Sequence, residues 1–145
     1  MSNDSAQATA DRVRDEMFAR DRASRDLGMR VLEMTPGVAT LSMTVREDML
    51  NGHQICHGGL IAALADSAFA FACNSRNEMT VASGFSVEFC APASLGDVLT
   101  VRCAELSRGK RTGVYDAEVV NQQGKRIALF RGRSYALKGR VVVAP

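Results

Sequence analysis

Tryptophan is absent from this chain of 145 residues, and only 6% of its residues are aromatic. Lysine and arginine outnumber aspartate and glutamate by so little that the formal net charge is +2. Proteins that bind nucleic acid commonly combine a basic patch with stacking aromatic rings, and no such run occurs in this sequence. The composition therefore argues against nucleic-acid binding.

The sequence also has no apolar run long enough to cross a membrane. The longest run extends from Gly58 to Cys73, would reach roughly 24 Å as a helix against the ~30 Å of a bilayer core, and contains Asp66. The N-terminus, MSNDSAQATADRVRDEMFARD, is rich in acids and has no apolar core of the kind that a secretory signal needs. We therefore expect a cytoplasmic protein that does not contact a membrane.

Cysteine and histidine are too few and too scattered to indicate a metal site. The cysteines are Cys56, Cys73, Cys90 and Cys103. They show no CxxC spacing, so we expect reduced thiols that serve as small apolar residues. His53 and His57 are four residues apart, but the glycines around them disfavour a helix, and no further ligands with a recognisable spacing occur. We predict no metal.

The first part of the chain reads as a helix followed by two strands. Residues 7–26 carry apolar and charged residues at roughly helical spacing, which predicts an amphipathic helix that ends near Gly28. The segments MRVLEM and VATLSMTV follow, separated by the turn TPG. In the second segment Leu41, Met43 and Val45 alternate with polar residues, as in a half-buried strand.

The segment 57–76 predicts a central helix. Its length and alanine content favour a helix, and its apolar residues cover all sides, so the rest of the protein must wrap it. Four later segments read as the wrapping strands: TVASGFSVEFCA, DVLTVRCAEL, RTGVYDAEVVN and RIALFRGRSYALKG. Short turns with Gly, Pro or Asn separate them, so we expect antiparallel hairpins between consecutive strands.

This order of elements predicts an α+β fold in a single domain, residues 1–145, with about six strands curled around one helix. No internal repeat, low-complexity segment or second domain is visible. The ends, residues 1–6 and 139–145, are candidates for flexible segments. The tail GRVVVAP reads either as a frayed end or as an extra edge strand.

Asp66 and Ser67 are the polar exceptions within the central helix. A carboxylate in apolar surroundings is costly unless it has a partner or a purpose. One interpretation is a structural aspartate that is hydrogen-bonded to a neighbour. The other is a base or nucleophile, because burial would raise its pKa and suit it to either role.

Gly58 and Gly59 begin the same helix. The first amides of a helix have no internal acceptor, and together with the helix dipole they suit a developing oxyanion. A glycine pair that only forms a tight turn is the alternative. Asp66 lies roughly 11–12 Å further along the helix axis, so one chain can hardly bring both features to one carbonyl carbon. A shared site would need a dimer in which the two glycines of one subunit face Asp66 of the other.

Other catalytic motifs are missing. The sequence has no G-x-S-x-G elbow, its two histidines lie in one loop, and neither a dinucleotide-binding nor a P-loop signature occurs.

Three blocks of the sequence carry a family resemblance: MLNGHQICHGGLIAALADSAFAFACNS, VEFCAPASLGD and GKRTGVYDAEVVNQQGKRIALFRGRSYAL. With them the chain resembles the hotdog-fold acyl-CoA thioesterases of the phenylacetate pathway, the PaaI group, over most of its length after about residue 16. The resemblance implies the hotdog fold, in which a curled antiparallel sheet wraps a long central helix. It also implies hydrolysis of phenylacetyl-CoA or related aryl-CoA thioesters to the free acid and CoA.

The resemblance assigns roles to individual residues. Asp66 matches the family's catalytic carboxylate, which acts as a nucleophile or as a base for water. Gly58 and Gly59 match the oxyanion loop, and His57 matches the histidine before it. Asn51 matches the polar residue that positions the thioester or the water, although the pair Asn-Gly alone would also explain a turn there.

Ser67 occupies a position where relatives carry a small hydroxyl residue, usually threonine. The phosphates of coenzyme A should meet basic residues, and among the candidates in SRGKR and RGR we select Lys110 and Arg111, although a solvated turn explains them equally well. The resemblance further implies a homotetramer, built as a dimer of dimers with active sites across the dimer interface. No cofactor is needed, because coenzyme A is part of the substrate.

Two other functions remain open at this stage. A hotdog dehydratase or hydratase would act on acyl thioesters with an aspartate–histidine pair, to which His57 could contribute. A non-catalytic acyl-CoA-binding domain would use Asp66 only structurally.

Overall fold

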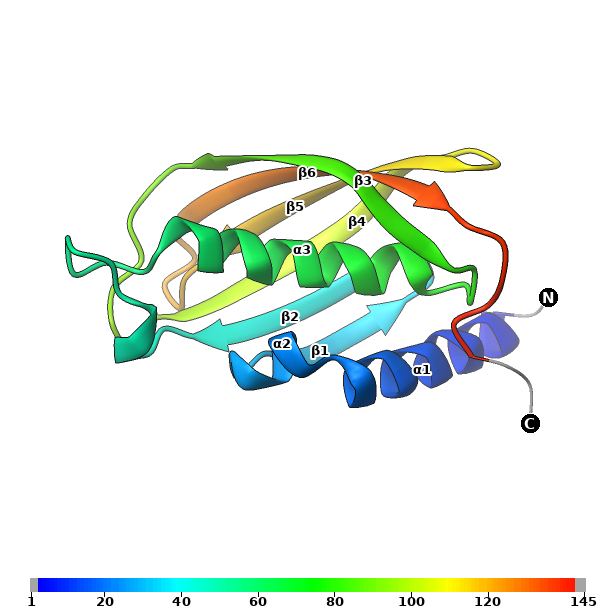
Figure 1. Ribbon diagram of the computed structural model, residues 1–145, viewed down its shortest axis with the longest axis horizontal. Coiled ribbons are helices and arrows are strands. Elements are labelled where there is room, and N and C mark those ends of the chain that lie inside the picture. The colour runs from blue at the N-terminus through cyan, green and yellow to red at the C-terminus, as the bar shows by residue number, and fades with distance from the viewer. Residues whose placement is uncertain (1–2, 143–145) are drawn as a thin grey trace.

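The computed structural model describes residues 3–142, in which one antiparallel sheet curls around a central helix (Figure 1). The helices are α1 (Asn3–Arg20), α2 (Arg22–Asp26), the short 3₁₀ helix η1 (Glu47–Met49) and α3 (Gly58–Asn74). The strands are β1 (Arg30–Thr35), β2 (Val38–Thr44), β3 (Thr80–Phe89), β4 (Val98–Arg108), β5 (Thr112–Val120) and β6 (Arg126–Ala136). The predicted α+β class and the predicted order of helices and strands are confirmed.

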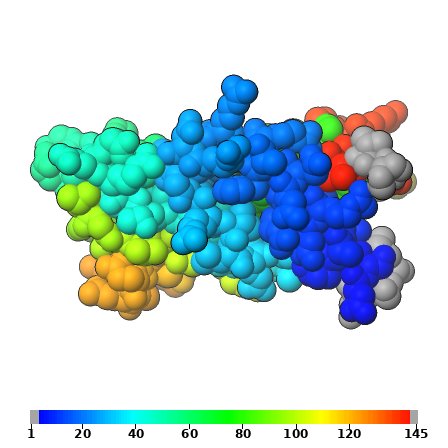
Figure 2. Space-filling model, turned by 90° about the horizontal axis from the view of Figure 1, so that it is seen from below, coloured from blue at the N-terminus to red at the C-terminus, as the bar shows by residue number. Residues whose placement is uncertain are grey.

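The N-terminal helix differs in detail from the prediction. It begins at Asn3, so residues 3–6, which were candidates for a flexible end, form its first turn, and it is interrupted at Asp21. Asp21 caps α2, because its side chain accepts a hydrogen bond from the backbone N–H of Ser24 at 3.0 Å. Both helices lie beside β1, on the face of the molecule that Figure 2 shows in blue and cyan.

The strands are arranged in the order β1-β2-β4-β5-β6-β3, and every neighbouring pair is antiparallel. The predicted hairpins β1–β2, β4–β5 and β5–β6 are confirmed, whereas the expected hairpin between β3 and β4 is wrong. The chain enters β3 from α3 at the far edge of the sheet, where β3 pairs with β6, and residues 90–97 then cross the end of the sheet to β4. The backbone N–H of Cys56 holds this crossing by donating to the carbonyl of Ala93 at 2.8 Å.

The hydrophobic core lies between α3 and the concave face of the sheet. Phe69 of α3 packs between Tyr115 and Phe130, with ring centroids at 5.4 and 5.7 Å. Gly132 of β6 makes room for this ring, because a Cβ atom at that position would lie 2.7 Å from the nearest atom of Phe69. The ring of Phe69 on α3 therefore packs into space that is free only because Gly132 of β6 has no side chain.

The expectation that this chain wraps α3 on all sides is only partly confirmed. Leu64, Ala68 and Phe71 are buried against the sheet or α1. Gly59 is exposed, and Asp66 is only half-buried on the same helix. The single chain therefore leaves part of the apolar helix uncovered.

The cysteines are free thiols, as predicted. Cys56, Cys73 and Cys103 are buried as expected, but Cys90 is exposed, because it follows the last residue of the edge strand β3. Burial raises the pKa of Cys73 and of Cys103 to about 12, so these thiols are protonated near neutral pH.

The described part of the C-terminal tail, residues 139–142, forms no strand. It packs on the connection between α3 and β3, where the backbone N–H of Val142 donates to Oδ1 of Asn77 at 2.7 Å. No helix within residues 3–142 combines the length and the apolar character that are needed to cross a membrane.

Candidate active site

The loop before α3 is shaped by Asn51. Its side-chain oxygen accepts hydrogen bonds from the backbone N–H groups of His53 at 2.9 Å and Ile55 at 3.4 Å. Gln54 completes the turn in the left-handed backbone region, with φ of 61°. Asn51 therefore has the turn-forming role that its sequence context allowed. Its side-chain nitrogen has no partner among the described residues and stays available to a ligand.

Two glycine amides are left without acceptors where α3 begins. His57 precedes the helix with φ −59° and ψ 130°, and its backbone N–H donates to the carbonyl of Met49 at 2.8 Å, which fixes the start of the helix. Within residues 3–142 no group accepts a hydrogen bond from the N–H of Gly58 or Gly59. These two donors, at the positive end of the helix dipole, can bind a carbonyl oxygen that becomes negative.

A cleft of about 490 Å³ opens in front of these amides. Asn51, Gly58, Ile61, Phe89 and Cys90 contribute to its walls. The ring of Phe89 lies against Gly58, where a Cβ atom would be 3.0 Å from Cζ, so the glycine allows the ring to cover the start of the helix. The cleft thus has apolar walls beside the amide of Gly58, with Gly59 next in the chain, as the binding of an acyl group requires.

Asp66 lies outside this cleft. It follows Gly58 by eight residues on the same helix, which corresponds to about 12 Å along the axis. Its carboxylate is half-buried and has no hydrogen-bond partner in the part of the chain that the structure describes. Burial raises the pKa of Asp66, and the negative charge of Asp21 raises it further. The structure therefore brings Asn51 and Gly58 together and leaves Asp66 apart from them within one chain.

Ser67 is connected to residues that sequence reasoning missed. Its hydroxyl lies 2.8 Å from the hydroxyl of Ser24, which donates to Oδ2 of Asp21 at 2.7 Å. The segment DRAS, residues 21–24, begins with an aspartate, one of the residues preferred at a helix N-cap. That pattern could have revealed the cap, but not the contact with Ser67.

Lys110 and Arg111 lie in the turn between β4 and β5, at the end of the molecule opposite the start of α3 (Figure 1). The length of α3 separates the two ends by about 25 Å. Arg108 is paired with Glu78 at 2.6 Å, which leaves the two turn residues as the freer cations there. In one chain they therefore lie far from the amide pair.

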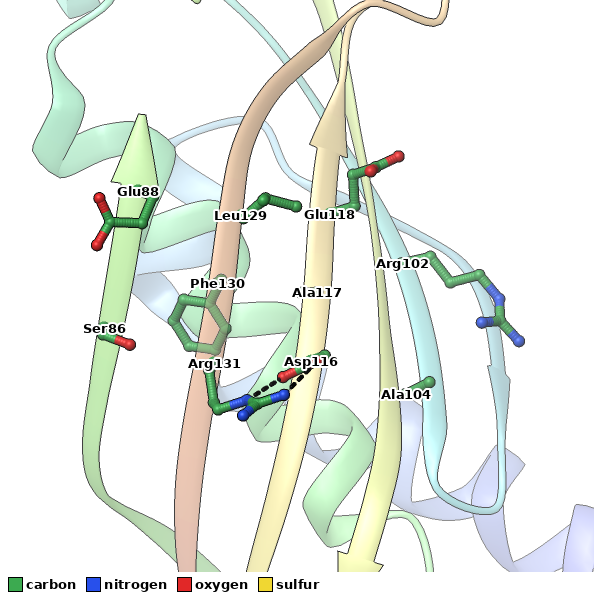
Figure 3. A pocket seen from close by; sticks show the side chains of 10 residues that line it. All are labelled: Ser86, Glu88, Arg102, Ala104, Asp116, Ala117, Glu118, Leu129, Phe130 and Arg131. Atoms are coloured by element: carbon green, nitrogen blue, oxygen red, sulfur yellow. Dashed lines mark hydrogen bonds and ion pairs between the residues drawn. The ribbon is translucent and has the colours of Figure 1, made fainter. Parts of the chain in front are cut away.

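Two further hollows lie away from these residues. One, of about 470 Å³, is on the outer face of the sheet, where Arg131 binds Asp116 through two hydrogen bonds of 2.6 and 2.8 Å (Figure 3). The other, of about 630 Å³, lies between α1, α2 and β1 and carries Arg14, Arg25 and Arg30. Among residues 3–142 no three His, Cys, Asp or Glu side chains come together as a metal site would require.

Comparisons with known proteins place the chain in a family. Residues 53–128 match the model of the Thioesterase superfamily. The chain is 47% identical over 125 residues to the acyl-coenzyme A thioesterase PaaI of Escherichia coli, a match that covers 86% of this chain and 89% of that protein.

Solved structures agree with this result. The PaaI protein of the E. coli phenylacetic acid degradation operon superposes with a TM-score of 0.92 and 44% identity, covering 93% of this chain and 98% of that one. A mutant of the phenylacetic acid degradation protein PaaI from Thermus thermophilus gives a TM-score of 0.78 and 39% identity, covering 81% and 100%. The chain therefore belongs to the thioesterase superfamily and has the hotdog fold that its sequence predicted.

Proposed function

We propose that this protein is an acyl-CoA thioesterase that hydrolyses phenylacetyl-CoA and related aryl-CoA thioesters in the cytoplasm, as a step of aromatic catabolism. The observation that carries the proposal is that the amides of Gly58 and Gly59 have no acceptor within residues 3–142 and that Gly58 lies in the wall of a largely apolar cleft. The carboxylate of Asp66, which has no hydrogen-bond partner among the described residues, lies on the same helix. The similarity to the E. coli thioesterase supports the substrate class.

A complete site requires two subunits in this proposal. The edge strand β3 exposes Val81, Phe85 and Phe89, next to the uncovered side of α3. A twofold axis that pairs two β3 edges would bury these side chains and bring Asp66 towards the partner's Gly58. Two such dimers would form the homotetramer. The same axis brings the end that carries Lys110 and Arg111 near the partner's cleft, where they would bind the phosphates of coenzyme A.

The reaction follows from the chemistry of these groups. The acyl carbonyl oxygen accepts hydrogen bonds from the amides of Gly58 and Gly59, and the ionised Asp66 of the partner takes a proton from water. The hydroxide adds to the carbonyl carbon, and the resulting oxyanion stays on the two amides. When the C–S bond breaks, its electron pair leaves with the sulfur, which takes the proton from Asp66. The products are the carboxylic acid and the free thiol of coenzyme A.

A second route uses the same carboxylate as the nucleophile. Asp66 would add to the carbonyl carbon, expel the thiolate and form a mixed anhydride that water then hydrolyses. Label in Asp66 after a single turnover in ¹⁸O-labelled water would identify this route. The base route labels only the released acid, whereas attack of water on the aspartyl carbonyl of the anhydride labels Asp66.

Asn51 and His57 complete the proposed site. Asn51 lies in the wall of the cleft, and its side-chain nitrogen would donate to the thioester or to the attacking water. The exposed His57 follows the turn and would line the entrance beside the amides. No metal or prosthetic group takes part, and coenzyme A enters only as part of the substrate.

The primary test is the release of thiol from phenylacetyl-CoA, benzoyl-CoA and octanoyl-CoA by the wild type and by Asp66→Asn. We expect release from the aryl substrates by the wild type and a loss of about 10²- to 10⁴-fold in the variant. Binding of a non-hydrolysable thioether analogue should be retained. Release by Asp66→Asn at the wild-type rate would contradict the mechanism, and absence of release from all three would favour a hydratase or a binding domain.

The amide pair can be tested with a matched pair of variants. Gly58→Pro removes the N–H, and the backbone of His57, with ψ of 130°, already has the extended conformation that a following proline requires. Gly58→Ala makes the same close contact with Phe89 but keeps the N–H. We expect kcat to fall about 10²- to 10³-fold further in the proline variant than in the alanine variant. Equal activities would remove the Gly58 amide from the mechanism.

A further inference from the structure

We propose that Asp21 is a positioning residue for Asp66: acting through Ser24 and Ser67, it ties the junction of α1 and α2 to α3 and places a second negative charge near the catalytic carboxylate. This inference rests on the proposed function, because it takes Asp66 as the reacting group. It concerns residues 21–24, to which the proposed mechanism gives no role.

The hydrogen bonds define a continuous chain from one segment to the other. Oδ1 of Asp21 accepts from the backbone N–H of Ser24 at 3.0 Å, and Oδ2 accepts from the Ser24 hydroxyl at 2.7 Å. The Ser24 and Ser67 hydroxyl oxygens lie 2.8 Å apart. Ser24 is only 2% exposed, so this contact is shielded from water. A buried polar side chain thus joins α2 to the helix position next to Asp66.

The number of hydroxyl protons determines which group donates in each of these hydrogen bonds. A serine hydroxyl has one proton to donate, and that of Ser24 is used on the carboxylate of Asp21. In the contact between the two serines, Ser67 must therefore be the donor. Ser67 therefore donates to Ser24, and Ser24 donates to the charged carboxylate of Asp21. Each of these hydrogen bonds polarises the next. The Ser67 proton is held towards α2, and its oxygen keeps lone pairs that can accept a hydrogen bond.

Asp21 also acts on Asp66 by its charge. Burial is the main cause of the raised pKa of Asp66, and the charge of Asp21 is the second. A carboxylate with a raised pKa binds a proton more readily, which favours its action as a base near neutral pH. Both routes of hydrolysis need the ionised form, so the same group sets the pH at which the enzyme becomes active.

Three arginines of α1 and α2 are held by other partners. From α1, Arg14 binds Asp11 and Asp15, and Arg20 donates to the carbonyl of Val141. From α2, Arg25 donates to the carbonyl of Ala19.

None of the fully buried side chains within residues 3–142 is charged. The strands β2 and β4 turn buried apolar residues towards α3, such as Leu41 and Val101. Further along α3, the thiol of Cys73 has a pKa raised to about 12 and is neutral. Asp21 is therefore the charged group of residues 3–142 whose field acts on Asp66.

The test is Asp21→Asn, which removes the charge but keeps an oxygen that can cap α2. Two quantities are measured, the pH dependence of kcat/KM and the titration of the Asp66 carboxyl carbon by NMR. We expect both to move to lower pH by about half a pH unit. The control is Asp26→Asn, which makes the same charge change at an exposed position of α2 and should leave both where they are in the wild type.

A second variant, Asp21→Ser, keeps an N-cap oxygen without charge and should give the same downward shift. Ser24→Ala keeps the charge of Asp21 but removes the hydroxyl that links Asp21 to Ser67. We therefore expect the pH of half-maximal kcat/KM to stay unchanged while kcat falls several-fold. An Asp66 titration in Asp21→Asn that matches Asp26→Asn would overturn the inference. A titration that moves without the rate profile would leave the coupling of the two aspartates intact and refute the catalytic role of Asp66.

Discussion

At the scale of single residues, Asp66 is costly to the fold. A carboxylate without a hydrogen-bond partner among residues 3–142, half-buried and near another carboxylate, is destabilised in its charged form. Its proposed catalytic role explains why such a residue occurs in the middle of an apolar helix. Active sites often contain groups that the fold would be more stable without.

This cost predicts that Asp66→Asn stabilises the protein at neutral pH. Because the folded-state pKa of Asp66 lies above its unfolded value, its contribution to stability is fully present below the unfolded pKa and is lost as pH rises through the folded pKa. Asparagine has no charge to lose. We expect the variant to have the higher Tm at pH 8, by about 2–4 °C for each kcal/mol relieved, and the difference to close near pH 3.

The measurement is thermal unfolding followed by circular dichroism between pH 3 and pH 8. Asp26→Asn, at an exposed position, serves as the control for removal of a charge. A Tm difference between Asp66→Asn and the wild type that is the same at every pH would contradict this explanation.

At the scale of elements, the contact between α3 and β6 depends on Gly132. A methyl group at this position would meet three atoms of the Phe69 ring at 2.7 to 2.9 Å, and the ring is held between Tyr115 and Phe130. We expect Gly132→Ala to lower the free energy of unfolding by about 1–3 kcal/mol, as overpacking of a dense core does. Urea denaturation measures the change.

Two controls separate crowding from a general effect of losing a glycine. Gly52→Ala adds the same methyl group where nothing lies within 4 Å, and it should leave the free energy of unfolding nearly unchanged. Phe69→Leu in the Gly132→Ala background should recover part of the loss, since leucine vacates the space that the ring occupies. Two losses that simply add would speak against a clash between these positions.

The elements that could be predicted are those with a local signal. Alternation and turn residues predicted all six strands, and alanine content predicted α3. The pairing of β3 with β6 could not be predicted, because turn residues show where a strand ends but not at which edge of the sheet it lies. Asp66 and the two glycines were candidates because they stand out in a short segment. The contact of Ser24 with Ser67 joins positions 43 residues apart, and no local pattern reports it.

At the scale of the whole molecule, the proposed site is shared between subunits, and this predicts complementation. Asp66→Asn and Gly58→Pro should each be nearly inactive. In a mixed dimer, one of the two sites combines the intact Gly58 of one chain with the intact Asp66 of the other. After unfolding and refolding an equal mixture, we expect about a quarter of the wild-type activity.

Activity of the refolded mixture no greater than the mean of the two variants would show that each site lies within one chain. Sedimentation velocity on the same samples reports whether mixing changed the assembly. Each variant refolded alone is the control.

The proposed binding of one coenzyme A by two subunits gives a further prediction. If Lys110 and Arg111 of one subunit bind the phosphates of a coenzyme A held by the other, the double alanine variant should raise the KM of phenylacetyl-CoA roughly tenfold with little change in kcat. A phenylacetyl thioester of N-acetylcysteamine, which lacks the nucleotide, should not respond.

The matched control is the double alanine variant at Arg25 and Arg30, which removes the same charge from the hollow between α1, α2 and β1. A rise in KM confined to this control would move the phosphate site to that hollow.

The position of β3 has a consequence for how the protein is made. In the sheet β3 pairs with β6. The strand β3, which ends at Phe89, therefore has no strand to pair with until β6, which ends at Ala136, has been synthesised. At typical rates of synthesis this delay is roughly 2–10 s, during which an apolar edge and one side of α3 stay uncovered on the ribosome. The sheet is therefore complete only after β6 has been synthesised. A premature stop before β6 would leave both edges of the protein's core open to aggregation or to chaperones.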